Sequence, residues 1–196
     1  MKRAVFLDRD GVINRLVYNP STGEHESPHD EKDFELMPGA VEALKSLEEQ
    51  GFLLFLVSNQ PSFAKGKASF EALHAVHEKF CRLMEAAEVH FTEYYYCYHH
   101  PEGVVPELAR VCSCRKPGPL FLQQARDRYG LDLARAWMVG DRDSDVECGK
   151  ACGTRTILIE NPHSAAKRGK SSPDSRAASL ADAAAYISAH ARGDIE

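Results

Sequence analysis

Residues 4–12 read AVFLDRDGV, an apolar run that leads directly into two aspartates separated by one residue. A continuous apolar run of this kind is typical of a parallel strand that is covered on both faces. Because side chains alternate along an extended chain, Asp8 and Asp10 are expected on the same side, while Arg9 points elsewhere. Two neighbouring carboxylates repel each other unless a cation or a proton lies between them. The pair therefore marks a candidate reactive site at the carboxyl end of a strand, with a simple aspartate turn as the alternative.

The rest of the chain alternates between short apolar runs and helical patterns. Further strands are expected at 52–57, 91–96, 136–139 and 154–159. Helices are expected at about 38–50, 69–87, 120–129, 143–152 and 179–190. The segments between them include two long loops, at 14–38 and 97–117, and a small, locally basic mobile loop at 161–178. Strands that alternate with helices predict an α/β fold with a doubly wound parallel sheet, here in one domain over residues 1–196.

Composition and charge narrow the class of protein. The chain has 196 residues, of which 43% are hydrophobic, enough to bury one sizeable core. Its net charge of −5 gives no sign of a nucleic-acid partner. No apolar stretch approaches the roughly 20 residues of a membrane helix, and the N-terminal residues carry no signal-peptide pattern. These features predict a cytoplasmic protein without membrane contact, and the lack of an exposed apolar stripe predicts a monomer.

Three more polar stretches occur where a predicted strand ends or a predicted helix begins. They read SNQ at 58–60, RKP at 115–117 and GDRDSD at 140–145. In this order, and together with DRDGV at 8–12, they resemble the four motifs of the haloacid dehalogenase (HAD) phosphotransferase superfamily. The resemblance covers about residues 3–160 and implies a Rossmann-like sheet. The segments between the predicted elements leave no room for a large cap domain, so a capless fold is expected.

The resemblance implies a phosphatase that works through a covalent aspartyl-phosphate. Asp8 would attack the phosphorus atom in line. Asp10 would give a proton to the leaving oxygen and later remove one from the attacking water. Ser58 and Lys116 would hold the phosphate oxygens as their negative charge shifts.

The same resemblance implies a Mg2+ site. Its ligands would be Asp8, the backbone carbonyl of Asp10 and Asp141, which are hard oxygen donors of the kind that Mg2+ prefers. Asp145 would orient Lys116 or the waters of the metal, with a simple role in the first turn of a helix as the alternative. Substrate recognition is assigned to Asn59, Gln60, Arg115 and Arg142.

The cysteines predict a second metal site. Six cysteines in a chain without signs of secretion favour metal binding over disulfides. The candidate ligands, three thiolates and one imidazole, suit a closed tetrahedral Zn2+ site, and they are Cys97, His99, Cys112 and Cys114. His100 is the alternative to His99, and unconnected cysteines are the alternative to a site. A zinc without an open position would be structural and would fix the loop at about 97–116. The remaining cysteines are expected in helices as small core residues, and they are Cys81, Cys148 and Cys152.

A narrower resemblance rests on this loop. A Cys-x-His pair followed by Cys-x-Cys directly before RKP resembles the D-glycero-D-manno-heptose 1,7-bisphosphate 7-phosphatases, and histidinol-phosphate phosphatases share this loop type. The resemblance implies Mg2+-dependent removal of the C7 phosphate of that heptose bisphosphate. The product would feed the synthesis of nucleotide-activated heptose for lipopolysaccharide or another surface glycan.

Some stretches depart from the pattern of that family and leave the substrate open. The loop segment 18–23 is longer than expected, and Pro61-Ser62-Phe63 replaces the usual Ser-Gly-Ile. Another small phosphorylated sugar is therefore an alternative substrate. Histidinol phosphate would need acidic groups for its ammonium, and the candidates are Glu24, Glu26 and Asp30. A silent zinc module that acts through protein contacts is the alternative from a different class. Three cations of the basic segment either help to hold a phosphate or form a solvated charge run, and they are Lys167, Arg168 and Lys170.

Overall fold

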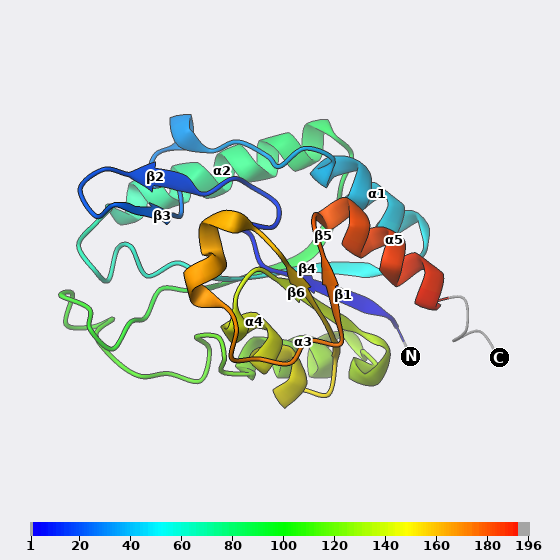
Figure 1. Ribbon diagram of the computed structural model, residues 1–196. Helices are drawn as coiled ribbons and strands as arrows, with labels where there is room; N and C mark the ends of the chain where they lie inside the picture. The colour runs from blue at the N-terminus through cyan, green and yellow to red at the C-terminus, as the bar shows by residue number, and fades with distance from the viewer. Residues whose placement is uncertain (1, 192–196) are drawn as a thin grey trace.

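The computed structural model describes residues 2–191, and within them one parallel sheet carries the fold (Figure 1). Its strands follow the order β5-β4-β1-β6-β7-β8. They are β1 (Ala4–Leu7), β4 (Leu53–Asn59), β5 (Phe91–Cys97), β6 (Trp137–Gly140), β7 (Arg155–Ile159) and β8 (Ser175–Ala177). Every neighbouring pair is parallel, which confirms the predicted sheet.

Helices cover both faces of this sheet (Figure 1). One face carries α1 (Ala40–Glu49), α2 (Phe70–Ala86) and α5 (Leu180–Ala191), and the other carries α3 (Leu120–Tyr129) and α4 (Asp143–Ala151). The predicted helices agree with these bounds to within two residues at each end. Among residues 2–191, no helix combines the length and the apolar character needed to cross a membrane.

Strand β1 is buried on both faces, as its apolar run predicts. Val5 and Leu7 pack in the core with α1, α2 and α5, whereas Ala4 and Phe6 pack in the opposite core with α3 and α4. Phe6 stacks on Phe55 of β4 with ring centroids 5.1 Å apart. Burying one large apolar side chain contributes about 1.5–3 kcal/mol. This packing fixes both the position of β1 and the direction in which the chain leaves it.

The first predicted loop, 14–38, contains regular structure that the sequence did not indicate. A small antiparallel hairpin, β2 (Val17–Asn19) and β3 (Glu24–Glu26), is followed by a 3-10 turn, η1 (Glu31–Asp33). The hairpin is closed by the amide of Gly23, which donates to the carbonyl of Asn19 at 2.8 Å. Strands of three residues are too short to show an alternating pattern, so only the tertiary structure reveals them. The hairpin is small, and it leaves the capless prediction intact.

The segment 161–178 was also predicted as a loop, and this prediction is wrong in part. Pro162–Lys167 form a 3-10 helix, η3, and Ser175–Ala177 form the edge strand β8 beside β7. Asp174 explains why the chain turns into a strand at this point. Its carboxylate accepts hydrogen bonds from the amide and the hydroxyl of Thr156 at 2.8 and 2.7 Å, while the amide of Asp174 donates to the Thr156 carbonyl.

We predict that Asp174→Asn lowers the free energy of unfolding by about 1 kcal/mol at pH 7, because it removes charge-assisted hydrogen bonds. Burial opposes ionisation, but hydrogen bonds from Thr156 and the charge of Lys150 outweigh it and lower the pKa of Asp174. A lowered pKa stabilises the folded state fully above the unfolded value of about 3.9. The difference between wild type and variant should therefore shrink as the pH falls below about 4.

Urea unfolding at pH 7 and at pH 3.5 measures this difference. Glu160→Gln is the matched control, since Glu160 pairs with Arg176 on the exposed edge at 3.2 Å, and the loss of this pair should cost under about 0.5 kcal/mol. An Asp174→Asn variant as stable as wild type at pH 7 would contradict the role assigned to this carboxylate.

Candidate active site and metal sites

The polar residues predicted from the sequence converge at the carboxyl ends of three adjacent strands. Asp8 and Asp10 follow β1, Ser58 lies near the end of β4, and Asp141 follows β6. These strands occupy the middle of the sheet in the order β4-β1-β6. Because parallel strands end at the same edge, residues far apart in the sequence meet there. The structure thus brings these predicted residues together at one edge of the sheet.

Lys116 forms the centre of this cluster. Its Nζ lies 3.0 Å from Oδ1 of Asp8 and 2.7 Å from Oδ1 of Asp145, and it donates to the carbonyl of Val57 at 2.6 Å. The three charged groups are buried. Burial would lower the pKa of Lys116, but the two carboxylates outweigh it and raise that pKa. A fixed ammonium therefore lies beside the predicted nucleophile.

Asp145 fulfils both roles that the sequence left open. One carboxylate oxygen pairs with Lys116, and the other accepts a hydrogen bond from the amide of Arg142 at 3.0 Å at the start of α4. The second contact satisfies a backbone donor at the helix N-terminus. Asp145 thus connects the helix cap to the ammonium of Lys116.

Asp141 is fully buried, and within residues 2–191 neither of its carboxylate oxygens has a hydrogen-bond partner, while Nε of Arg142 lies 3.6 Å from its Oδ1. Burial raises the pKa of Asp141 to about 7, although the charge of Arg142 opposes this shift. Oxygens of Asp8, Asp141 and Asp145 all lie within 4.8 Å of one another. Unpaired buried carboxylates are costly unless a cation compensates them. The donor set therefore fits a hard divalent ion such as Mg2+.

Gly11 makes room for this carboxylate. Its φ is +86°, and a Cβ atom on it would lie 2.3 Å from Oδ2 of Asp141. Asn161, which the sequence analysis did not single out, donates from Nδ2 to the Gly11 carbonyl at 3.0 Å. The turn after the aspartate pair is thus held open by a residue 150 positions away.

Asp10 lies among a different set of side chains. Its Oδ1 accepts from Nε and Nη2 of Arg9 at 3.1 and 3.0 Å and from Asn14 at 3.0 Å, and its Oδ2 accepts from Gln60 at 2.5 Å. Burial would raise the pKa of Asp10, but Arg9 and these hydrogen bonds outweigh it and lower that pKa. The expectation that Arg9 points elsewhere is wrong. Its long side chain folds back onto Asp10, the next residue. Two acidic residues that flank one arginine are the sequence signal that could have indicated this ion pair.

The SNQ stretch at 58–60 forms hydrogen bonds with both Lys116 and Asp10. The amide of Asn59 pairs with the backbone of Lys116, accepting at 3.0 Å and donating at 3.1 Å. Gln60 donates to Asp10 and also to the hydroxyl of Ser58 at 3.0 Å. Asn59 and Gln60 therefore hold reactive groups in place, while their predicted contact with substrate stays a prediction.

A polar pocket lies beside Asn59, at the carboxyl end of β4. Its cationic lining residues are Lys65, Lys67, Arg115, Arg142 and Lys167. Arg115 and Arg142 were expected here. Lys65 and Lys67 were not, since they lie in a loop that has no motif of its own. The opposite lining comes from residues 24–27, at the end of the hairpin and just after it.

The residues that depart from the family pattern form part of this pocket wall. Pro61 and Ser62 line it, whereas Phe63 packs its ring on Phe70 with centroids 5.9 Å apart. Ser62 is itself hydrogen-bonded to His29 at 2.8 Å.

The acidic residues considered for an ammonium are engaged with the protein. Glu26 pairs with Lys67 at 2.6 Å, and Glu24 lies 3.7 Å from Lys167. Asp30 caps η1 by accepting from the amide of Lys32 at 2.9 Å. Of the basic segment, Lys167 lines the pocket, while Arg168 donates to the carbonyl of Ile159 at 3.0 Å.

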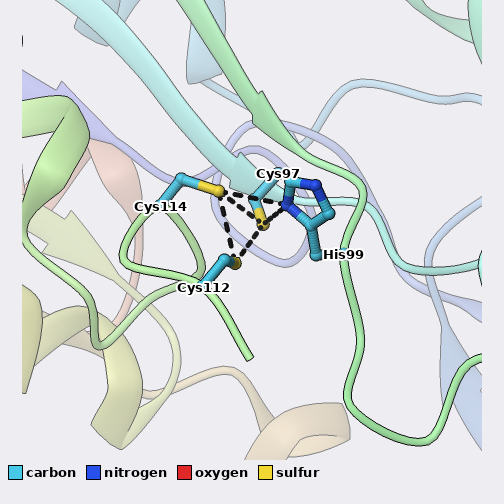
Figure 2. Close-up of side chains that lie close together, drawn as sticks. All are labelled: Cys97, His99, Cys112 and Cys114. Atoms are coloured by element: carbon cyan, nitrogen blue, oxygen red, sulfur yellow. Dashed lines mark hydrogen bonds between the residues drawn. The ribbon is translucent and has the colours of Figure 1, made fainter. Parts of the chain in front are cut away.

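Figure 2 shows the second cluster, where the side chains of Cys97, His99, Cys112 and Cys114 point toward one another. The three sulfurs lie 3.3–3.6 Å apart, and Nδ1 of His99 lies 3.3 Å from Sγ of Cys114 and 3.7 Å from Sγ of Cys97. A tetrahedral zinc with bonds of about 2.3 Å requires sulfurs about 3.8 Å apart. The donor set and spacing therefore fit zinc.

The cluster also distinguishes the two neighbouring histidines. His99 contributes its Nδ1, whereas Nδ1 of His100 accepts from the amide of Glu102 at 3.1 Å. The remaining cysteines lie outside the cluster. Cys148 is fully buried, as predicted, while Cys81 and Cys152 are half-buried.

Comparisons with known proteins agree with this geometry. A family model described as HAD-hydrolase-like matches residues 113–183. A D-glycero-beta-D-manno-heptose-1,7-bisphosphate 7-phosphatase of Vibrio cholerae is 39% identical over 158 residues, 81% of each chain. The corresponding alpha-named enzyme of Photorhabdus laumondii is 32% identical over 162 residues, 82% of this chain and 84% of its own.

A solved structure is similar over nearly the whole chain. It is the D,D-heptose 1,7-bisphosphate phosphatase of B. bronchiseptica, complexed with magnesium and phosphate, with a TM-score of 0.78 and 25% identity. The match covers 97% of this chain and 99% of that one. Since relatives above 30% identity align over about four-fifths of the sequence, this chain belongs to the D-glycero-D-manno-heptose-1,7-bisphosphate 7-phosphatase family of HAD-like hydrolases.

Proposed function

We propose that the protein is a Mg2+-dependent phosphatase that removes the C7 phosphate of D-glycero-D-manno-heptose 1,7-bisphosphate. The observation that carries this proposal is the position of Lys116, which pairs with Asp8 and Asp145 at the edge of a cationic pocket. An ammonium held between two buried carboxylates, with the buried Asp141 close by, suits a doubly charged phosphoryl group and a metal ion.

The reaction would take two steps on the residues of this chain. In the first, an oxygen of Asp8 bonds to phosphorus as the bond to the sugar oxygen breaks. Asp10, which must enter this step protonated although Arg9 favours its ionised form, gives that oxygen a proton. In the second, Asp10 takes a proton from water, whose oxygen replaces Asp8 on phosphorus. Lys116 and Ser58 hold the phosphate oxygens during both steps. Mg2+ held by Asp8, the Asp10 carbonyl and Asp141 would supply positive charge against the repulsion between carboxylate and phosphate.

The pocket supports a substrate with two phosphates. The C7 phosphate would lie at Asp8, which leaves the cations of the wall for the rest of the molecule. Arg115 and Arg142 offer planar donors that suit phosphate oxygens. Direct contacts of Asn59 and Gln60 with the sugar belong to the same proposal.

A structural Zn2+ at the cysteine cluster completes the proposal. Zinc held by the three cysteines and His99 would tie the end of β5 to the residues just before Arg115 and Lys116. In small zinc peptides, binding of this kind contributes on the order of 10 kcal/mol to folding. The metal would thus fix where the two cations enter the site.

The alternatives draw less support from the structure. Histidinol phosphate would need a free acidic group, but Glu24 and Glu26 at the pocket are paired with lysines. A silent zinc module would not need the buried set of Asp8, Lys116 and Asp145. Relatives carry names for both anomers of the heptose, so the preferred anomer is part of the test. A cytoplasmic location, a monomeric state and a place in nucleotide-heptose synthesis stay predictions.

Phosphate release in the presence of Mg2+ tests the proposal. The panel contains both anomers of heptose 1,7-bisphosphate, histidinol phosphate, fructose 1,6-bisphosphate and an aryl phosphate. We expect kcat/KM for one heptose anomer to exceed all other values at least about a hundredfold, since each tenfold step needs about 1.4 kcal/mol of binding. A higher value for histidinol phosphate would reject the heptose assignment, and uniformly weak turnover would leave only the phosphatase chemistry.

We predict that Asp8→Asn lowers kcat at least about a thousandfold, because the amide cannot attack phosphorus. Folding and zinc content should not change. Asp143→Asn is the matched control: this nearby carboxylate accepts from Lys170 and Ser171 rather than facing Lys116, so activity should stay within about threefold. Steady-state kinetics measure both variants, and residual activity near wild type in Asp8→Asn would refute a covalent role.

We predict that Cys112→Ser lowers the zinc content well below one ion per chain and reduces kcat/KM at least about tenfold, since the loop before Arg115 loses its anchor. Cys152→Ser, outside the cluster, should keep both zinc and activity. Elemental analysis of the purified proteins and kinetics with saturating Mg2+ give the two readings. Full activity without zinc would show that the cluster does not position the cations.

A further inference from the structure

Arg9 is one of the largest buried side chains in the described part of the chain, with 1% of its surface exposed. In the sequence, Arg9 lies between Asp8, the predicted nucleophile, and Asp10, the predicted acid and base, yet no step proposed above uses it. A buried guanidinium is stable only when its donors are paired. Its Nε and Nη2 both reach Asp10, at distances of 3.0–3.3 Å.

The other side of the guanidinium faces aromatic rings. Its Cζ lies 5.8 Å from the ring centroids of both Phe34 and Tyr96. The charge of Asp10 and the neighbouring Tyr96 raise the pKa of Arg9 against the effect of burial. Arg9 thus contacts a carboxylate on one side and aromatic rings on the other.

Tyr96 in turn contacts α2. Its hydroxyl lies 2.9 Å from Nδ1 of His77. Burial raises the pKa of Tyr96, and burial and nearby cations lower the pKa of His77, so a neutral phenol and a neutral imidazole share this hydrogen bond. A continuous series of contacts therefore runs from Asp10 through Arg9 and the ring of Tyr96 to His77.

We propose that Arg9, held by Tyr96, is a positioning residue that fixes the Asp10 carboxylate for its two proton transfers. This inference rests on the acid and base role proposed for Asp10. Asp10 also accepts from the neutral side chains of Asn14 and Gln60. Among the described residues, Arg9 is the cation that donates to this carboxylate from two nitrogens, and a two-point contact sets its direction as well as its distance.

The chemistry of the leaving group distinguishes positioning from simple structural support. A sugar oxygen must receive a proton as its bond to phosphorus breaks, whereas a nitrophenolate leaves without one. Misplacing Asp10 therefore slows the first step for a sugar phosphate and hardly affects it for an aryl phosphate. The ratio kcat/KM reports this first step alone, because release of the leaving group makes it irreversible.

The test compares kcat/KM for p-nitrophenyl phosphate with that for the sugar phosphate that performs best in the substrate panel. Arg9→Lys keeps the charge but loses the two-point contact, and Tyr96→Phe removes only the hydroxyl. Tyr95→Phe is the matched control, since Tyr95 lies next to Tyr96 on β5 and stacks on Phe121, away from Arg9. Thermal unfolding establishes which variants are folded.

We expect Arg9→Lys to lower kcat/KM at least tenfold more for the sugar phosphate than for the aryl phosphate, Tyr96→Phe about threefold more, and Tyr95→Phe equally for both. Equal losses for both substrates in Arg9→Lys, or no loss, would overturn the inference. If Arg9→Lys does not fold, Tyr96→Phe decides by the same criterion. Asp10→Asn tests the role of Asp10 separately. If this variant loses kcat/KM equally for the sugar phosphate and the aryl phosphate, the acid and base role proposed for Asp10 is wrong, and the inference about Arg9 is wrong with it.

Discussion

The contact of the Lys116 ammonium with three oxygens is the interaction on which the site depends. Asp8, Asp145 and the carbonyl of Val57 come from β1, α4 and β4, while Lys116 itself comes from the loop after β5. A buried ammonium is stable only with such partners, so its burial requires all four segments to be in place. Asn59 holds the backbone of Lys116 from the other side. Fold and site therefore stabilise each other here, and neither can form completely without the other.

The two aspartates of the first motif lie in opposite electrostatic surroundings. Burial raises the pKa of Asp8 despite the charge of Lys116, whereas Arg9 and several hydrogen bonds lower the pKa of Asp10 against burial. A lowered pKa favours the ionised form of Asp10, which is the form that takes a proton from water in the second proposed step. Asp141 shares the raised pKa of Asp8. The turn after β1 thus separates a carboxylate beside Lys116 from a carboxylate beside Arg9.

The sequence was sufficient to predict the sheet and the edge at which the polar residues meet. The reason is that the carboxyl ends of adjacent parallel strands lie at the same edge of a sheet, regardless of the loops that connect them. It was not sufficient for elements that depend on distant partners. Strand β8 needs Asp174 to meet Thr156, and hairpin β2–β3 is too short to show a pattern. The spacing of Cys97 and His99 could not exclude His100, since only the backbone decides which ring turns inward. The contact of Arg9 with Asp10 depends on how a long side chain folds back, which alternation along a strand does not describe.

The hairpin has a consequence for how this fold diversifies. It meets the rest of the pocket through side-chain pairs that include Glu26 with Lys67, Glu24 with Lys167, and the rings of His25 and His163 stacked at 3.8 Å. None of these pairs includes a carboxylate of the acidic cluster. The hairpin side chains that line the pocket therefore pair with residues outside that cluster. Substitutions in the hairpin can change the pocket wall and leave the buried carboxylates as they are.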